Sequence, residues 1–394
     1  MIPLELSRGA AAVRSGAIDD LHATLTRRPD IVSFAVGAPD LTLLPPELFS
    51  GLAADALGKF GSSILQYGST RGFAPLLERS RTLLRQRSID CPTDRIHIAT
   101  GGSGALHNVC MALLDPGDVV LVETPTYGPA IKAFRGHRAT VVGVESDRFG
   151  ILPDALDDAL DRHAAAFVYL LPTFQNPTGR TMPAQRRAQV AEVIRRRDAL
   201  VIEDDVYADL RYRGEPVPAL YSFAPDNSIY ITSLSKTLAP ALRIGITVMR
   251  EELLQGVLPL KESIDMQTST FCQAIAAEFL DSETGSAHLA RVVETYSMKL
   301  DILTNALEKY MPRGFHWVKP DGGMFVWVDG PPDFDADEVA RRGLEHGVAF
   351  LPGSIFHADD RAGRNSMRLS FAGVPANRID RGIELLADLC GEFA

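Results

Sequence analysis

The pattern of hydrophobic and polar positions divides the chain into short apolar runs and longer stretches of helical periodicity. Between about residues 95 and 250, seven runs rich in β-branched residues are predicted to be strands. These runs are 95–100, 119–123, 139–145, 165–171, 199–205, 228–233 and 244–249. Helical periodicity fills several of the intervals, for example residues 184–198.

Strands that are apolar throughout, with helices between them, are typical of a mostly parallel sheet covered on both faces. The pattern therefore predicts an α/β fold in which helices sandwich a seven-stranded sheet. In such sheets ligands bind beyond the carboxyl ends of the strands. The residues that follow each predicted strand are therefore the first candidates for a functional site.

After residue 250 the pattern changes. Long helices are predicted, including roughly residues 286–311. Residues 315–329 are predicted to form two antiparallel strands joined at the Asp-Gly-Gly turn of residues 321–323. The simplest account is a smaller C-terminal α+β domain.

Composition narrows the class of partner. None of the 394 residues lies in an apolar run long enough for a membrane helix, and we expect a cytoplasmic protein because the N-terminal residues show no secretory signal. The four cysteines are scattered and the histidines fit no metal motif, so we expect no metal. A net charge of -10 argues against nucleic acid and acidic membranes and favours a small-molecule partner.

A glycine-rich turn at residues 101–105 follows the first predicted strand and precedes a helical run. Such a turn presents backbone N–H groups at the positive end of a helix dipole, which suits a phosphate. The same residues nearly match the GxSxG nucleophile elbow, which would make Ser103 a hydrolase nucleophile. Residues 233–236, SLSK, also fit the SxxK pattern of serine acyl enzymes. At this point the three interpretations stay open.

Polar residues follow the later strands. Asn176 lies in an Asn-Pro turn, and residues 203–205 are three consecutive acids, of which Glu203 is expected to be structural. Asp204 and Tyr207 are three residues apart and could address one ligand from a helical turn.

Lys236 lies in an apolar, serine-rich segment with Arg243 seven positions further on. Serine hydroxyls and a guanidinium can bind phosphate, and an apolar pocket lowers the pKa of a lysine, which makes it a nucleophile for carbonyls. A phosphate site, a lysine, a carboxylate and a phenol at strand ends together indicate pyridoxal 5'-phosphate, with its aldehyde on Lys236 and its ring nitrogen on Asp204.

These residues resemble the fold type I pyridoxal-phosphate enzymes of the class I/II aminotransferase family. More narrowly, they are similar to the branch that includes 2-aminoadipate aminotransferases and the aminotransferase domains of MocR-type regulators. The segments that carry the resemblance are VSFAVGAPD (32–40), LQYGSTRGFAPLLE (65–78), VETPTYGPA, QNPTGRTM, IEDDVYADLRY, SLSKTLAPALRIG, PDGGMFVWV, FLPGSIFH (350–357) and MRLSFAG (367–373).

The resemblance implies roles around the cofactor ring. Lys236 forms the internal aldimine and later moves the proton, while Asp204 pairs with the ring nitrogen and keeps the ring an electron sink. Asn176 and Tyr207 hydrogen-bond the ring 3'-oxygen, and Tyr127 stacks on the ring face.

The resemblance also implies how the phosphate and the substrate are held. Tyr67 would reach the phosphate of a neighbouring subunit, so a homodimer with shared active sites is expected. Arg368 would bind the substrate α-carboxylate as a bidentate fork, with Asn176 beside it, and Gly37 would lie where the N-terminal segment closes over the substrate. The residues expected to hold the phosphate are Gly102, Ser103, Gly104, Ser233, Ser235 and Arg243, which removes Ser103 as a nucleophile.

The predicted function is a ping-pong exchange of an amino group between an L-amino acid and a 2-oxo acid. The resemblance implies an N-terminal arm and lid (1–45), a large cofactor-binding domain (46–280) and a small domain (281–394). Alternatives are an enzyme of the same fold that uses the carbanion for C–C bond formation, elimination, substitution or oxidation, a non-catalytic sensor, and a hydrolase. The lid after Gly37 is more apolar than in the branch, which reflects either an apolar substrate or simple drift.

Overall fold

The computed structural model describes residues 6–13, 17–280, 282–359 and 361–393. The helices are α1 Arg8–Ala12, α2 Ala17–Arg27, α3 Pro46–Phe60, α4 Ala74–Arg85, α5 Gly101–Leu113, α6 Gly128–Gly136, α7 Pro153–Arg162, α8 Ala184–Arg196, α9 Glu251–Asp265, α10 Thr270–Leu280, α11 Glu283–Tyr310, α12 Ala336–Gly343 and α13 Ala376–Phe393. The strands are β1 Val32–Ser33, β2 Ile96–Thr100, β3 Val119–Glu123, β4 Thr140–Val144, β5 Ser146–Asp147, β6 Gly150–Ile151, β7 Ala165–Leu170, β8 Val201–Asp204, β9 Ser228–Ser233, β10 Ile244–Val248, β11 His316–Trp317, β12 Phe325–Asp329, β13 Val348–Ala349, β14 Leu351–Pro352 and β15 Ser366–Ser370.

The central sheet contains seven strands in the order β2-β10-β9-β8-β7-β3-β4. Strands β4, β3, β7, β8 and β9 pair in parallel, whereas β10 is antiparallel to both of its neighbours. The mostly parallel seven-stranded sheet predicted from the apolar runs is confirmed, and each run contains one of these strands.

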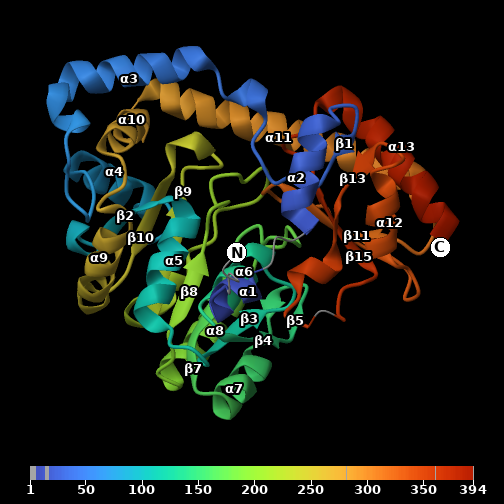
Figure 1. The fold of residues 1–394 in the computed structure, drawn as a ribbon, viewed down its shortest axis with the longest axis horizontal. Coiled ribbons are helices and arrows are strands. Elements are labelled where there is room, and N and C mark those ends of the chain that lie inside the picture. The colour runs from blue at the N-terminus through green and yellow to red at the C-terminus, as the bar shows by residue number, and fades with distance from the viewer. Residues whose placement is uncertain (1–5, 14–16, 281, 360, 394) are drawn as a thin grey trace, which may run out of the picture.

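Alternate residues of the strands face opposite sides of the sheet, and both sides are buried, which explains why the runs are apolar throughout. On β2, Ile96 and Ile98 pack with residues of α4 and α10, while Ala99 packs on the other side with residues of α5. On β7, Val168 packs with residues of α7 and α8, while Phe167 packs with Phe134 of α6. Figure 1 shows these helices around the strands.

A second, four-stranded sheet has the order β11-β12-β15-β14 and packs with the helices that follow residue 280. The predicted antiparallel pair in residues 315–329 is present, because His316 pairs with Asp329. The connection between the two strands spans residues 318–324 and includes the Asp-Gly-Gly segment. Gly322 forms a bridge with Arg211, and a Cβ on Gly322 would lie 2.3 Å from the Leu210 carbonyl oxygen. Because Gly322 has no side chain, this loop can pack closely against the backbone of residues 210 and 211.

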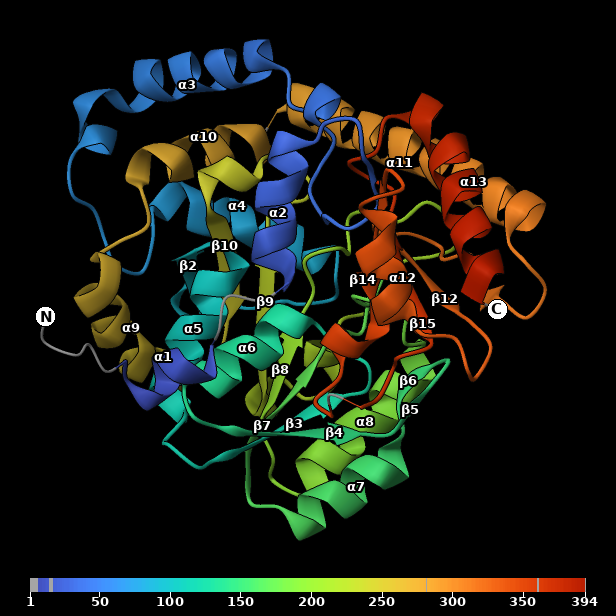
Figure 2. The same ribbon diagram turned by 45° about the vertical axis from the view of Figure 1, so that its right-hand side comes forward.

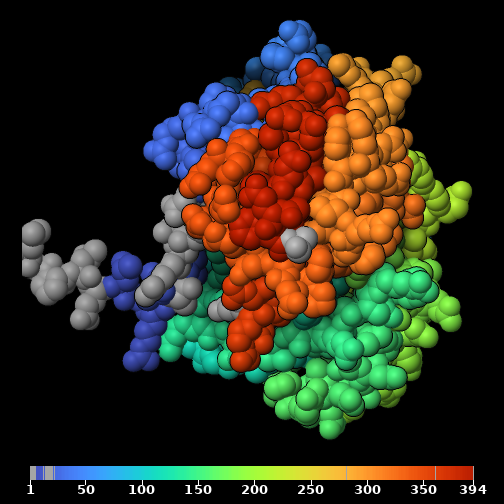
Figure 3. Space-filling model, turned by 90° about the vertical axis from the view of Figure 1, so that its right-hand side faces the viewer, coloured from blue at the N-terminus to red at the C-terminus, as the bar shows by residue number. Residues whose placement is uncertain are grey.

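The N-terminal segment joins the C-terminal part of the chain. Strand β1 pairs in parallel with β13, and Ser370 donates a backbone hydrogen bond of 2.8 Å to Phe34 O. Helix α2 lies beside the C-terminal elements in both ribbon views (Figures 1 and 2). The space-filling view shows the red helix α13 against the orange α11 (Figure 3). Within the described ranges, no helix has both the length and the apolar character required to cross a bilayer.

Candidate active site

The junction between β2 and α5 forms an anion cradle. Gly101 has φ of +76°, and a Cβ there would lie 2.3 Å from the Arg243 guanidinium, so only glycine fits. The Thr100 hydroxyl does not cap the helix, because it donates to Asp265 Oδ2 at 2.6 Å. The first N–H groups of this 13-residue helix therefore lack a side-chain cap from Thr100, and the helix dipole favours an anion beside them.

A cavity of about 230 Å³ opens beside this cradle. Ser233 and Ser235 contribute hydroxyl oxygens that lie 2.9 Å apart, and Arg243 contributes a guanidinium. Asp204 is the one acidic residue among the described residues that line this cavity. One end of the cavity therefore presents backbone N–H groups, hydroxyls and a cation, which is the donor set that binds phosphate.

Asp204 is the last residue of β8 and is only 8% exposed. Its Oδ2 accepts a hydrogen bond of 2.6 Å from the Tyr169 hydroxyl, while its buried Oδ1 has no partner within the described part of the chain. Burial raises the pKa of Asp204 to about 6. This carboxylate is fixed by one oxygen and keeps the other free to accept an N–H or N⁺–H from a ligand in the cavity.

Lys236 follows β9, and its Nζ donates a hydrogen bond of 2.8 Å to Gly37 O. Burial and the nearby charges of Arg368 and Arg243 lower the pKa of Lys236 to about 8. Roughly one such lysine in ten is neutral at pH 7, against fewer than one in a thousand at the ordinary pKa. The site therefore contains a nucleophilic amine near neutral pH.

A second cavity, of about 160 Å³, adjoins the first at Lys236. Tyr127, Tyr207 and Lys236 line both cavities, so these side chains stand between them. Burial raises the pKa of Tyr127 to about 12 and raises that of Tyr207 even more, so both phenols stay protonated and can donate hydrogen bonds. The other described residues lining the second cavity are Leu21, Ala35, Val36, Gly37, Pro129, Asn176, Phe325, Leu351, Phe356 and Arg368.

Arg368 on β15 is a buried cation without a carboxylate partner among the described residues that line this cavity. Its guanidinium donates to Asn176 Oδ1 at 2.9 Å and to Ala35 O, while its buried Nε has no described partner. The guanidinium lies 4.3 Å from the Phe325 ring centroid and 5.1 Å from that of Phe356. Burial lowers the pKa of Arg368 to about 10, so the cation persists at neutral pH and would be stabilised by an anionic ligand.

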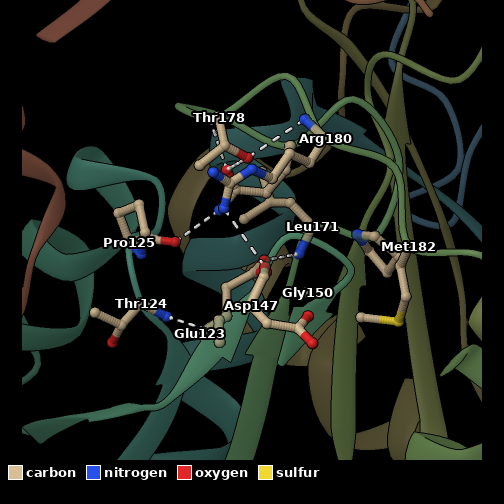
Figure 4. A pocket seen from close by; sticks show the side chains of 12 residues that line it. Glu123, Thr124, Pro125, Asp147, Gly150, Leu171, Thr178, Arg180 and Met182 are labelled. Atoms are coloured by element: carbon tan, nitrogen blue, oxygen red, sulfur yellow. Dashed lines mark hydrogen bonds between the residues drawn. The ribbon is translucent and has the colours of Figure 1, made fainter. Parts of the chain in front are cut away.

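The loop that carries Asn176 is tied to the loop that carries Tyr127 (Figure 4). Gln175 Nε2 donates to Pro125 O at 2.7 Å, and Gln175 Oε1 accepts from the Thr178 N–H at 2.8 Å. The Asn176 amide in turn donates to the Tyr207 hydroxyl at 3.3 Å. The small cavity in Figure 4 measures about 20 Å³, room for about one water, so this region positions the loops rather than binding a substrate.

The structure brings most of the predicted site residues together. Gly104 lies in the first turn of α5 but does not line either cavity, and Tyr67 lies outside both, with 74% of its surface exposed in the single chain. Among the described residues lining the cavity around Ser103 there is no histidine, so a hydrolase would lack its usual base there. The predicted residues that line the two cavities are Gly37, Gly102, Ser103, Tyr127, Asn176, Asp204, Tyr207, Ser233, Ser235, Lys236, Arg243 and Arg368.

Several site residues were not predicted. Tyr169 pairs in register with Ile202, so the two-residue period of a strand places it on the same face as Asp204. The position of Tyr169 beside Asp204 can be predicted only when the pairing of β7 with β8 is known. Leu21, Phe325 and Phe356 are apolar residues in helix or strand patterns that read as ordinary core positions, so no local signal singles them out.

Comparisons with known proteins agree with this geometry. Residues 29–386 match the family described as aminotransferase class I and II. An aromatic-amino-acid aminotransferase 1 from Thermococcus litoralis is 34% identical over 98% of this chain and 94% of its own length. Two solved structures are also similar over 98% of this chain and 97% of their own. An α-aminoadipate aminotransferase from Thermus thermophilus, complexed with N-(5'-phosphopyridoxyl)-L-leucine, has a TM-score of 0.90 at 33% identity. A kynurenine aminotransferase from Pyrococcus horikoshii, in complex with PMP, has a TM-score of 0.93 at 34% identity.

The match spans nearly the whole chain and includes every described residue that lines the two cavities except Leu21 of α2. The α/β fold with a smaller α+β part, the class of enzyme and the resemblance predicted from the sequence are confirmed. This chain belongs to the family of class I and II aminotransferases.

Proposed function

We propose that this chain is a pyridoxal-phosphate-dependent aminotransferase that exchanges an amino group between an L-amino acid and a 2-oxo acid in a ping-pong reaction. The observation that carries the proposal is the position of Lys236 where two cavities meet. One cavity has an anion cradle and a carboxylate oxygen without a partner in the described part of the chain. The other has a buried arginine and no carboxylate among its described lining residues.

The first cavity fits pyridoxal phosphate. The N-terminus of α5 with Ser233, Ser235 and Arg243 suits the phosphate, and Asp204 Oδ1 is a free acceptor for the ring nitrogen. When bound, pyridoxal phosphate supplies an aldehyde that bonds covalently to an amine and a ring that accepts electrons from the substrate α-carbon. Two related structures carry phosphopyridoxyl-leucine or PMP, as their descriptions state, which supports the same cofactor here.

The second cavity fits the amino acid. Arg368 would bind the α-carboxylate through a guanidinium edge, and its Nε has no hydrogen-bond partner among the residues that the structure describes. Asn176 accepts from the same guanidinium and donates to Tyr207, so these three side chains are held together as one network. Binding the α-carboxylate there directs the rest of the substrate towards Lys236, which lines the same cavity.

Lys236 and Asp204 would perform the proton chemistry. The neutral Lys236 Nζ takes a proton from the substrate α-carbon and later returns one, because its lowered pKa lets the amine exist in both forms near neutral pH. Asp204 stays ionised above about pH 6 and stabilises positive charge at the group it binds. Tyr127 and Tyr207 flank the lysine from both cavities and help to exclude water.

The experiment that tests this function follows the absorbance of the purified protein. A band near the visible edge should lose intensity when a single amino acid is added and recover when a 2-oxo acid follows, because the amino group is held by the enzyme between the two steps. A band that no amino acid changes would show that the site serves another reaction. No band after incubation with pyridoxal phosphate would contradict the cofactor assignment.

Tyr169 tests the role of Asp204 without touching the carboxylate. Replacing Tyr169 with phenylalanine removes the hydrogen bond that lowers the pKa of Asp204, so that pKa should rise. The acid form then persists to higher pH, and we expect the acid limb of the kcat/KM profile to move to higher pH. At pH 6.5 the rate should fall by about 5-fold. A profile of unchanged shape would contradict the coupling, and thermal unfolding controls for a general loss of stability.

We also propose a homodimer whose active sites are shared. Tyr67 is 74% exposed and Leu65 is 66% exposed in one chain, although aromatic and aliphatic side chains usually seek burial. Their segment is anchored by the Gly68 N–H, which donates to Gln267 Oε1. Two residues before Gln267, α9 ends at Asp265, which accepts from Thr100 at the start of the cradle. A partner's Tyr67 at the phosphate would complete each site.

A mixed dimer tests this arrangement. Chains with Lys236→Ala and chains with Tyr67→Ala are each expected to lose most activity at limiting cofactor. A hybrid purified by two different tags should regain one intact site, because one site would combine a normal lysine with a normal tyrosine from the partner. We expect about half of the wild-type activity per hybrid dimer. If Tyr67 acted within its own chain, the hybrid would be as inactive as its parents.

The proposal also includes the domain boundaries and the cellular location. The boundaries 1–45, 46–280 and 281–394 are supported by a hydrophobic core that combines Val32, Phe34 and Leu43 mainly with residues between 292 and 390. The large domain contributes Phe174, Tyr207 and Leu210 to this core, and the strands of the seven-stranded sheet pack in other clusters. A cytoplasmic location is supported by the four cysteines, which are all free thiols.

A further inference from the structure

We infer that the substrate amino acid has an uncharged, apolar side chain, branched aliphatic or aromatic, and that Leu21 on α2 is part of the wall that selects it. This inference rests on the proposed aminotransferase function and concerns the second cavity. The evidence is the apolar lining of that cavity and its two basic side chains, Lys236 and Arg368.

Much of the lining of the cavity is hydrophobic. Leu21, Val36, Pro129, Leu351 and Phe356 contribute it from separate segments of the chain. Leu21 also packs against a cluster that contains Leu351 and Phe356, so the wall is a packed surface and not a set of isolated side chains. A side chain that enters this cavity is therefore surrounded mainly by carbon atoms.

The two basic side chains that line the cavity are both assigned to steps of the proposed reaction. Lys236 and Arg368 are the only basic residues among the described residues that line it. Lys236 is assigned to the proton transfer and Arg368 to the α-carboxylate. A second carboxylate on the substrate would lose its water against Leu21, Val36 and Leu351 without gaining a positive partner from the described lining residues, which is costly. An apolar side chain gains free energy from the same surfaces.

The apolar residues that follow Gly37 in the lid contribute little to this selectivity for apolar side chains. Of the apolar lid residues, Leu41 is 83% exposed and Leu43 belongs to the C-terminal core, so neither lines the cavity. In the segment around Gly37, the residues that do are Ala35, Val36 and Gly37. The apolar wall is therefore completed by α2 and by residues 351–356, which the sequence alone did not connect.

The size of the cavity fits a compact apolar group. Its volume is about 160 Å³, similar to the roughly 150 Å³ of an engineered apolar cavity that binds benzene. In a ping-pong reaction the 2-oxo acid enters the same cavity as the amino acid. We therefore expect the preferred 2-oxo acids to be apolar as well.

The test compares apolar with acidic amino acids in the first half-reaction of the cofactor-loaded protein. Leucine, isoleucine and phenylalanine should react with kcat/KM at least about 100-fold above aspartate, glutamate and 2-aminoadipate. An acidic amino acid that matches or exceeds leucine would overturn the inference and leave the aminotransferase intact. A band that no amino acid changes would overturn both.

Binding of non-reacting analogues gives a readout that does not depend on turnover. By calorimetry, 4-methylpentanoate should bind the loaded enzyme at least about 10-fold more tightly than glutarate, because only the second acid buries an additional charge. Equal or reversed affinities would contradict the apolar wall.

A matched pair of variants tests the part assigned to Leu21. Leu21→Arg adds a cation to the wall and should reduce the leucine-to-glutamate ratio of kcat/KM by at least about 10-fold. Ala23→Arg adds the same charge to the same helix at an exposed position and should leave the ratio unchanged. If both variants change the ratio equally, or neither does, Leu21 does not select the side chain.

Discussion

Replacing Lys236 with alanine is expected to lower kcat by about 10⁴-fold or more, because the protein would lose both its nucleophilic amine and the group that moves the α-proton. The described residues lining the two cavities include no other lysine that could substitute. The measurement is single-turnover conversion of leucine at saturating pyridoxal phosphate. A small primary amine added to the variant should restore part of the rate, since it replaces the missing base.

Lys236→Arg is the matched variant for this experiment. It keeps a positive charge in the cavity but provides no neutral amine at pH 7, so its rate should fall as far as that of the alanine variant. Lys59→Ala, which removes an exposed lysine paired with Glu278, should retain normal activity. A Lys236→Ala protein that keeps more than about a tenth of wild-type kcat would contradict the assignment.

Replacing Arg368 with lysine should lower kcat/KM by about 10²- to 10³-fold, although the charge is preserved. The planar guanidinium offers two N–H groups to a carboxylate while it also donates to Asn176, and a lysine cannot reproduce this geometry. The effect should be largest in KM for the amino acid. Half-reaction rates at several substrate concentrations would measure it.

The control for Arg368 lies nearby in the sequence. Arg364 is an exposed residue paired with Asp335, and Arg364→Lys should change kcat/KM by less than about 2-fold. An Arg368→Lys protein with the wild-type KM would show that the α-carboxylate binds elsewhere. The buried Arg368 would then need another anion, because no carboxylate is among the described residues lining its cavity.

The large sheet was predictable because both of its faces are buried. Residues such as Ile96 and Ile98 pack on one side and Ala99 on the other, so the strands read as continuous apolar runs. The order of the strands was not predictable, because local periodicity does not contain pairing information. The role of the glycines at residues 322 and 323 was not predictable for a similar reason, since they lie close to Leu210 and Phe174, which are distant in the sequence.

Site residues were predictable where a polar side chain occurs at the end of an apolar strand. Lys236, Asp204 and Asn176 are polar residues at the ends of apolar strands, and the cost of burying them indicates a ligand. Tyr169 and Leu21 were not found, because a tyrosine in a strand and a leucine in a helix are normal core residues. Their roles arise from tertiary neighbours: Tyr169 donates to Asp204, and Leu21 lines the second cavity.

The charges in the two cavities serve different purposes, cofactor binding in the first cavity and substrate binding in the second. In the first cavity a carboxylate, Asp204, balances the cations around the phosphate cradle and keeps one oxygen for a ligand. The described residues lining the second cavity include no carboxylate, so Arg368 gains a negative partner there when a substrate carboxylate binds. Binding energy from the substrate carboxylate can therefore be used to orient the substrate at Lys236.

The most direct test of the central claim is to reduce the cofactor-loaded protein with borohydride and locate the modified residue by peptide mass spectrometry. Reduction makes the bond between a lysine and pyridoxal phosphate permanent, so the modified peptide identifies the amine that holds the cofactor. The structure predicts one phosphopyridoxyl group per chain, on the peptide that contains Lys236, and none on the Lys236→Ala variant. A modification on another lysine, or none on the wild-type protein, would contradict the account.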